Sequence, residues 1–190
     1  MTNPAQNPYT SSLPADQPGG QPGAQLSRGE IDQLIRVNQI ITFALANGIV
    51  VITAVMGYLT WSNNDCEFKF AFSGDDFLFP LIGFVMVGAT IPFGLIVKRV
   101  IFQQAREQAA RLQTSSSAGD DELVVSTEVM GRIASGTIIG QAAAEGGAVL
   151  NAVLMMIGDN FIHLIPIGVA FLAVIVQVPT YGRLCNWLRQ

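Results

Sequence analysis

The chain has 190 residues, of which 50% are hydrophobic and only 13% are charged, and its mean hydropathy is +0.42. A soluble domain normally carries about a quarter charged residues. This deficit argues against an ordinary water-soluble enzyme and places the chain in the membrane class. The net charge of −4 is divided among segments that apolar runs separate, so it indicates no particular partner.

The first part of the chain predicts a disordered tail. Prolines recur at positions 4, 8, 14, 18 and 22 among Asn, Gln, Ser and Gly. This composition buries too little apolar area to order itself, and it lacks the basic start and apolar stretch of a secretory signal. We expect residues 1–38 to form a Pro/Gly/Gln-rich cytoplasmic tail and residues 39–190 to form the membrane domain.

Four apolar runs follow, at residues 40–61, 77–97, 133–157 and 161–178, and the only Asp, Glu, Lys or Arg in them is Glu145. About 20 apolar residues at roughly 1.5 Å rise cover a hydrocarbon core near 30 Å. The runs lack the polar stripes of a soluble bundle and the alternation of a barrel strand. The sequence therefore predicts an all-α integral membrane bundle of four transmembrane helices.

The basic residues predict how the chain is threaded. Nine of the ten Lys and Arg residues lie before the first run, between the second and third, or after the fourth. By the positive-inside rule, both termini are expected in the cytoplasm. Residues 98–112 are rich in strong helix formers, so the second helix is expected to extend into the cytoplasm to about residue 112.

A weak internal similarity relates the first and third runs. When the chain is shifted by 98 residues, six of the sixteen pairs from 44/142 to 59/157 are identical. One interpretation is a duplication, with two helical hairpins related by an axis along the membrane normal. The other is chance similarity between segments rich in Ala, Gly and Val. In a duplication, Asn47 and Glu145 would occupy equivalent positions.

Glu145 is the candidate functional residue, because it lies near the middle of the third run. A charge at the bilayer centre costs roughly 2.5 to 3.5 kcal/mol even on lenient scales. The polar residues expected near its depth are Gln141, Asn47 and Asn151. Two interpretations stay open. In one, these four side chains form interhelical hydrogen bonds. In the other, Glu145 binds and releases a proton or sodium ion.

Small residues recur along the third run at spacings of three or four, at Gly136, Gly140, Ala144 and Gly147. This spacing puts them on one face of a helix, where small side chains let helix backbones approach closely. The stripe predicts helix packing within one chain or between copies.

No motif for catalysis, cofactor binding or metal binding is visible. Cys66 and Cys185 are expected on opposite sides of the membrane, so they form neither a pair nor a metal site. We expect no enzyme activity, no cofactor, no metal and no nucleic-acid partner. The expected partners are the lipid bilayer and either further copies of the chain or another membrane protein.

The segment 140–148, Gly-Gln-Ala-Ala-Ala-Glu-Gly-Gly-Ala, resembles the Ala-x-x-Glu-Gly-Gly-Ala stretch of proteolipid c subunits of rotary ATPases. In that family a mid-membrane carboxylate carries the ion, and Glu145 matches it. The family carboxylate lies on the second helix of a hairpin, however, whereas Glu145 lies on the first helix of the second hairpin.

The same Ala-x-x-Glu-Gly signature, together with Asn7-Pro8-Tyr9, is similar to a group of small uncharacterised bacterial four-helix membrane proteins with Pro-rich starts. This resemblance implies a multi-pass protein of the bacterial cytoplasmic membrane. We therefore expect a non-catalytic bundle that associates with itself or with a partner. The alternative is an ion- or proton-translocating subunit that uses Glu145.

Overall fold

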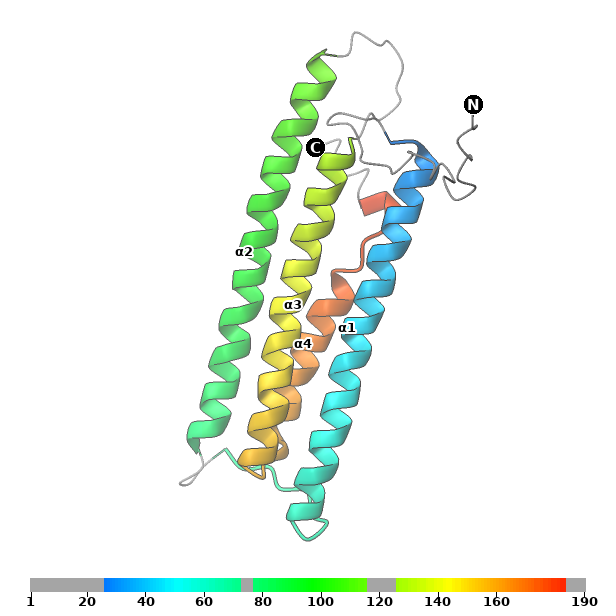
Figure 1. The fold of residues 1–190 in the computed structure, drawn as a ribbon. Helices are drawn as coiled ribbons and strands as arrows, with labels where there is room; N and C mark the ends of the chain where they lie inside the picture. The colour runs from blue at the N-terminus through cyan, green and yellow to red at the C-terminus, as the bar shows by residue number, and fades with distance from the viewer. Residues whose placement is uncertain (1–25, 73–76, 116–125, 184–190) are drawn as a thin grey trace, which may run out of the picture.

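A computed structural model describes residues 26–72, 77–115 and 126–183 of the chain. Its regular elements are the helices α1 (Arg28–Asn63), α2 (Leu78–Ser115), α3 (Thr127–Ile157) and α4 (Leu164–Val176), and a 3₁₀ turn, η2 (Phe161–His163) (Figure 1). The predicted all-α class is confirmed for these residues. The predictions for residues 1–25 lie outside the described part of the chain.

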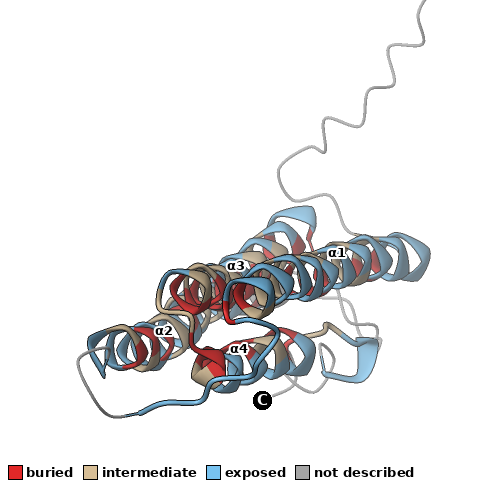
Figure 2. Cartoon of the chain, turned by 90° about the horizontal axis from the view of Figure 1, so that it is seen from below, coloured by how far each residue is buried: buried red, intermediate tan, exposed pale blue. Residues whose placement is uncertain are grey.

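Helix α3 is the centre of the bundle. Figure 2 shows α1 and α2 on opposite sides of α3 and α4 against a third side. The helices α1 and α2 hardly touch each other. The first two helices therefore do not pair as α3 and α4 do, and α4 is far shorter than α2. The described part of the chain does not contain two equivalent packed hairpins.

Helix α1 begins at Arg28, inside the segment 1–38 that the sequence predicts as a disordered tail, so that boundary is corrected. Ser27 is its N-cap: the Ser27 hydroxyl accepts from the Glu30 backbone N–H, and the Glu30 carboxylate accepts from the Ser27 backbone N–H at 2.8 Å. This is a capping box. Ile31 and Ile35 are buried in a cluster with residues of α2 and α3. This packing holds the first turns of α1 against the bundle.

Helix α3 also begins earlier than the predicted residue 133. Ser126 is the N-cap and accepts from the Val129 backbone N–H at 3.3 Å. Val129 and Met130 are buried in the first turn. Because of the cap and this burial, α3 begins at Thr127, before its apolar run starts.

The last apolar run, predicted as one crossing over 161–178, is shorter and less regular than expected. It starts as η2 and continues as α4, which ends at Val176. Pro179 disfavours the helical conformation at Val178, which explains the early end. The 13 residues of α4 span roughly 20 Å. By length and composition, α1, α2 and α3 are the three described helices able to cross a membrane.

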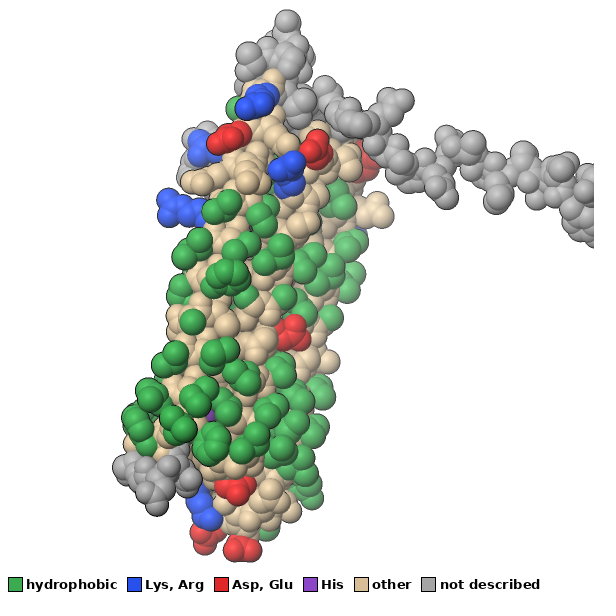
Figure 3. Space-filling model, turned by 60° about the vertical axis from the view of Figure 1, so that its left-hand side comes forward, with side chains coloured by type: hydrophobic (Ala, Val, Ile, Leu, Met, Phe, Trp, Pro, Cys, Tyr) green, Lys and Arg blue, Asp and Glu red, His purple; other side chains and the backbone are tan. Residues whose placement is uncertain are grey.

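Two apolar clusters hold the bundle together. In the larger cluster, the small residues Ala144, Ala148 and Ala152 of α3 pack against apolar side chains of α1, α2 and α4. The smaller joins the first turns of α1 and α3 to the last turns of α2. Most large apolar side chains point outward instead, and Figure 3 shows them as a band between two charged ends.

The two ends of the bundle differ. At one end the start of α1 meets the segment after α4: Arg28 lies 5.4 Å from the Tyr181 ring centre, and Gln39 donates to the Pro179 carbonyl at 3.0 Å. At the other end Asn160 binds Ala71 through its side chain, accepting at 3.2 Å and donating at 2.6 Å. Loop 64–72 is thereby tied to the turn between α3 and η2.

Candidate functional site

Glu145 lies half-buried on α3, at the edge of its contact with α1. A Cβ atom added to Gly48 of α1 would lie 3.1 Å from the Glu145 Oε1 atom. The small residue on α1 therefore leaves room for the carboxyl group. None of the hydrogen bonds or ion pairs of the described residues involves Glu145. The carboxyl thus has no polar partner within the described part of the chain.

Gln141, one turn before Glu145, has a different partner. Its side chain is buried, and its Nε2 donates to the Thr42 hydroxyl oxygen at 2.8 Å. That hydroxyl also lies 2.9 Å from the Asn38 carbonyl oxygen. Gln141 therefore joins α3 to α1, as interhelical hydrogen bonds in a bundle do, and it does not bind Glu145.

Asn47 is exposed on α1, next to Gly48. It makes no hydrogen bond among the described residues. It lies at the same depth as Glu145, because Gly48 is in contact range of the carboxyl. The structure therefore brings both residues to one level of the bundle without bonding them to each other.

Asn151 belongs to a separate buried cluster. Its Nδ2 donates to the carbonyl oxygens of Gly83 at 3.1 Å and Gly147 at 2.9 Å, and its Oδ1 lies 2.9 Å from His163 Nδ1. Since Oδ1 is an acceptor, His163 is assigned the tautomer with a proton on Nδ1. Asn151 is thus directed toward α2 and η2 rather than toward Glu145.

His163 is not among the candidate residues that the sequence indicates. The side chain is fully buried, and its Nε2 has no hydrogen-bond partner among the described residues. The useful signal was the position of Asn151 and His163 on either side of the turn at Gly158. That turn folds the two runs together and brings these polar side chains to one level.

The stripe of small residues on α3 faces its neighbours. Gly136 lies against Ile101 and Phe102 of α2, and Gly147 lies against Thr90. A Cβ atom on Gly94 of α2 would lie 3.0 Å from the Gly140 carbonyl oxygen. The backbones of α2 and α3 therefore approach closely at this crossing. Ala144 is fully buried in the larger apolar cluster.

The chemistry available to this arrangement is limited. No group of three His, Cys, Asp or Glu side chains able to hold a metal occurs among the described residues. Among the described residues, no hydrogen bond or ion pair joins Glu145 to a second carboxylate or to a base, as a general acid–base pair would require. A lone carboxyl can exchange a proton, or it can form a hydrogen bond with a group from outside its own chain.

Comparisons of the chain with family models, with curated proteins and with solved structures find no match.

Proposed function

We propose that the chain is a multi-pass membrane protein that associates with itself, with Glu145 of one copy bound to Asn47 of the next. One observation carries the proposal: both polar side chains lie at the same depth within the apolar band, and neither is hydrogen-bonded among the described residues. In lipid, an unpaired polar group is costly. A neighbouring copy supplies the missing partner.

Symmetry favours this pairing. Copies inserted in the same direction are related by an axis along the membrane normal, which keeps every residue at its own depth. Asn47 and Glu145 lie on adjacent helices at one level, so a head-to-tail contact between copies brings one against the other. Such contacts close into a ring when the rotation between copies allows it.

The surface beside Glu145 suits close helix contact. Gly131, Ser135, Ala142 and Gly146 are exposed on α3, on the side that its three neighbours leave open. A Cβ atom on Gly131 or on Gly146 would meet nothing within 4 Å. Small residues at this spacing let a helix of another copy approach closely.

Membrane insertion with both termini in the cytoplasm is part of the proposal. Basic side chains gather at one end of the apolar band in Figure 3, which supports this orientation under the positive-inside rule. The bacterial cytoplasmic membrane is proposed from the sequence resemblance. The short helix α4 completes a fourth crossing with residues 177–180, whose Pro179 carbonyl is satisfied by Gln39, as irregular backbone in a membrane requires.

Cysteine cross-linking between two single-cysteine chains tests the contact. In a Cys66→Ser, Cys185→Ser background, chains carrying Asn47→Cys and chains carrying Glu145→Cys are coexpressed and oxidised in membranes. We expect a disulfide-linked dimer of the two chains, because the positions meet across the interface. Phe93→Cys, exposed on α2 on the other side of α3, is the matched control and should not cross-link to Glu145→Cys.

Two substitutions of Glu145 separate this function from ion translocation. Glu145→Gln keeps hydrogen-bonding capacity and should leave the oligomer intact in size measurements by light scattering, whereas Glu145→Leu should yield monomers. Equal cross-linking to positions 47 and 93, or an unchanged oligomer in Glu145→Leu, would contradict self-association through Glu145. Loss of proton or sodium flux in proteoliposomes of an intact Glu145→Gln oligomer would favour the ion-translocating alternative.

A further inference from the structure

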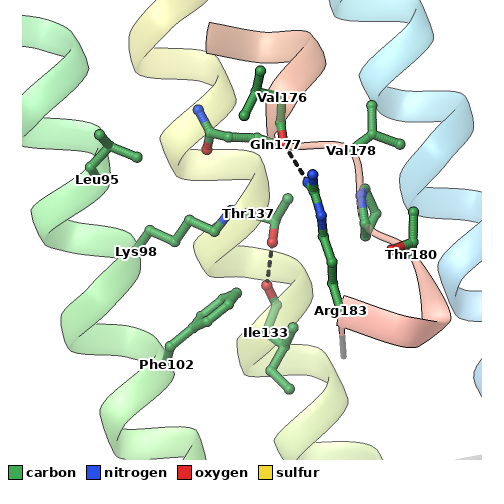
Figure 4. A pocket seen from close by; sticks show the side chains of 11 residues that line it. Leu95, Lys98, Phe102, Ile133, Thr137, Val176, Gln177, Val178, Thr180 and Arg183 are labelled. Carbon is green, nitrogen blue, oxygen red and sulfur yellow. Dashed lines mark hydrogen bonds between the residues drawn. The ribbon is translucent and has the colours of Figure 1, made fainter. Parts of the chain in front are cut away.

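A cavity of about 340 Å³ lies at the end of the bundle where α1 begins, between the end of α4 and the helices α2 and α3 (Figure 4). Its charged lining residues are Lys98 of α2 and Arg183, from the segment that follows α4. The remaining lining is mainly apolar, with Leu95, Phe102 and Val176 among the wall residues. This volume is within the range of small-ligand sites.

The two cations share this cavity without an acidic neighbour in its described lining. Arg183 donates from Nη1 to the Val176 carbonyl at the end of α4, at 2.6 Å, and its other N–H groups are not used in that bond. The Lys98 ammonium lies 5.4 Å from the centre of the Phe102 ring. Burial first, and the charge of Arg183 second, lower the pKa of Lys98. Two like charges therefore lie near each other, with Lys98 half-buried and Arg183 exposed.

We propose that this cavity binds the phosphate group of an anionic phospholipid, with Lys98 and Arg183 as its ligands. A phosphate placed between the two side chains neutralises their mutual repulsion, and charge-assisted hydrogen bonds from both favour it. Basic pockets between membrane helices at the cytoplasmic side are suited to anionic headgroups.

The position of the cavity selects a lipid rather than a free anion. Lys98 directly follows the predicted second crossing, 77–97, and so lies at the depth of the headgroups. Leu95 and Val176 line the cavity and also face outward, with 49% and 64% of their surfaces exposed. A lipid whose phosphate is in the cavity can therefore lay its acyl chains along these side chains. A zwitterionic choline headgroup would add a third cation to the site.

Thermal unfolding of the purified full-length chain in mild detergent tests the proposal. The probes are dioctanoyl-phosphatidylglycerol, dioctanoyl-phosphatidylcholine and inorganic phosphate. We expect the phosphatidylglycerol to raise the unfolding temperature with saturating dependence, and the other two to raise it much less. Lys98→Gln and Arg183→Gln should each weaken the apparent affinity about fivefold, and Lys98→Arg should retain it.

Arg99→Gln is the matched control, because Arg99 is the next residue on α2, is exposed and does not line the cavity. It should bind phosphatidylglycerol as the unsubstituted chain does. An equal shift with phosphatidylcholine, an equal shift with inorganic phosphate, or equal weakening by Arg99→Gln and Lys98→Gln would each overturn the proposal. The cavity does not involve Glu145, so the outcome of the lipid-binding measurement is independent of the outcome of the cross-linking experiment.

Discussion

Several buried polar side chains in the bundle are matched to specific partners. Gln141 is paired with Thr42, and Asn151 binds two carbonyl groups and His163. In a low-dielectric interior, such bonds are costly to break because the orphaned group has no water to replace its partner. Glu145 lacks such a pairing among the described residues, and it is the one acidic residue of the four apolar runs.

The cluster around Asn151 depends on a glycine of α2. A Cβ atom on Gly83 would overlap Asn151 Oδ1 and would lie 2.7 Å from His163 Nδ1. Gly83→Ala should therefore displace both side chains and destabilise the bundle by about 1–3 kcal/mol, as overpacking does. The measurement is reversible unfolding of the purified chain by titration of SDS into mild detergent.

Gly88→Ala on the same helix is the control. A Cβ atom at Gly88 would meet nothing within 4 Å, and alanine is the better helix former by about 1 kcal/mol. The control should be as stable as the original chain or slightly more stable. Unfolding of Gly83→Ala and Gly88→Ala at the same SDS fraction would contradict the close packing of Gly83 against Asn151 and His163.

Among the helices, capping residues and a proline account for where helices begin and end, and small residues account for how closely two of them pack. The caps at Ser27 and Ser126 begin α1 and α3, while Pro179 follows the end of α4. Small residues on α3 let α2 approach closely, and α3 is the central helix because it also contacts α1 and α4.

The start of α1 should depend on pH. Hydrogen bonds from the Ser27 backbone N–H and then from its hydroxyl hold the pKa of Glu30 below its ordinary value of 4.5. Because the folded-state pKa is lowered, the stabilisation is complete above the ordinary value and is lost as the pH falls through the folded-state value. Hydrogen exchange of the Glu30 and Ile31 amides, corrected for intrinsic rates, should accelerate in that acidic range.

Glu30→Gln provides the reference, because its amide does not titrate. Its exchange rates, corrected in the same way, should stay constant over this pH range. Protection of the first turn that is equally unaffected by acid in both chains would show that the capping box does not hold α1 in place.

The whole molecule combines an apolar band with two unlike ends. Loop 64–72, which carries Cys66, is attached to the turn before η2, whereas the extension of α2 and the segment after α4 are at the opposite end. If the basic end is cytoplasmic, reagents that do not cross membranes should distinguish these ends.

Maleimide labelling of right-side-out membrane vesicles measures this difference. Cys66 is exposed and free, so in a Cys185→Ser background it should react with an impermeant maleimide directly. Glu107→Cys, at an exposed site on α2 and with both native cysteines replaced, should react only after permeabilisation. Labelling of both positions without permeabilisation, or the reverse pattern, would refute the proposed orientation.

The length and composition of the apolar runs predicted the long helices well, but they predicted the exact helix starts and the side-chain partners poorly. The second run extends to Ser115, close to the expected 112, because strong helix formers continue the pattern. The start of α1 at Arg28 was missed, because the predicted boundary depended on the composition of residues 1–38 and not on the capping pair Ser27 and Glu30. The partners of Gln141 and Asn151 were also missed, since side-chain partners depend on helix rotation, and a single sequence does not fix that rotation.

Local composition and spacing suffice to predict the helical class, the apolar runs, the distribution of basic residues and the isolation of Glu145 in its run. The folded chain, by contrast, was needed to learn that α3 is central, that Asn151 binds His163, and that Lys98 and Arg183 line one cavity. These features join residues far apart in the chain, and they depend on which helix faces meet. Close contacts at small residues decide which faces those are.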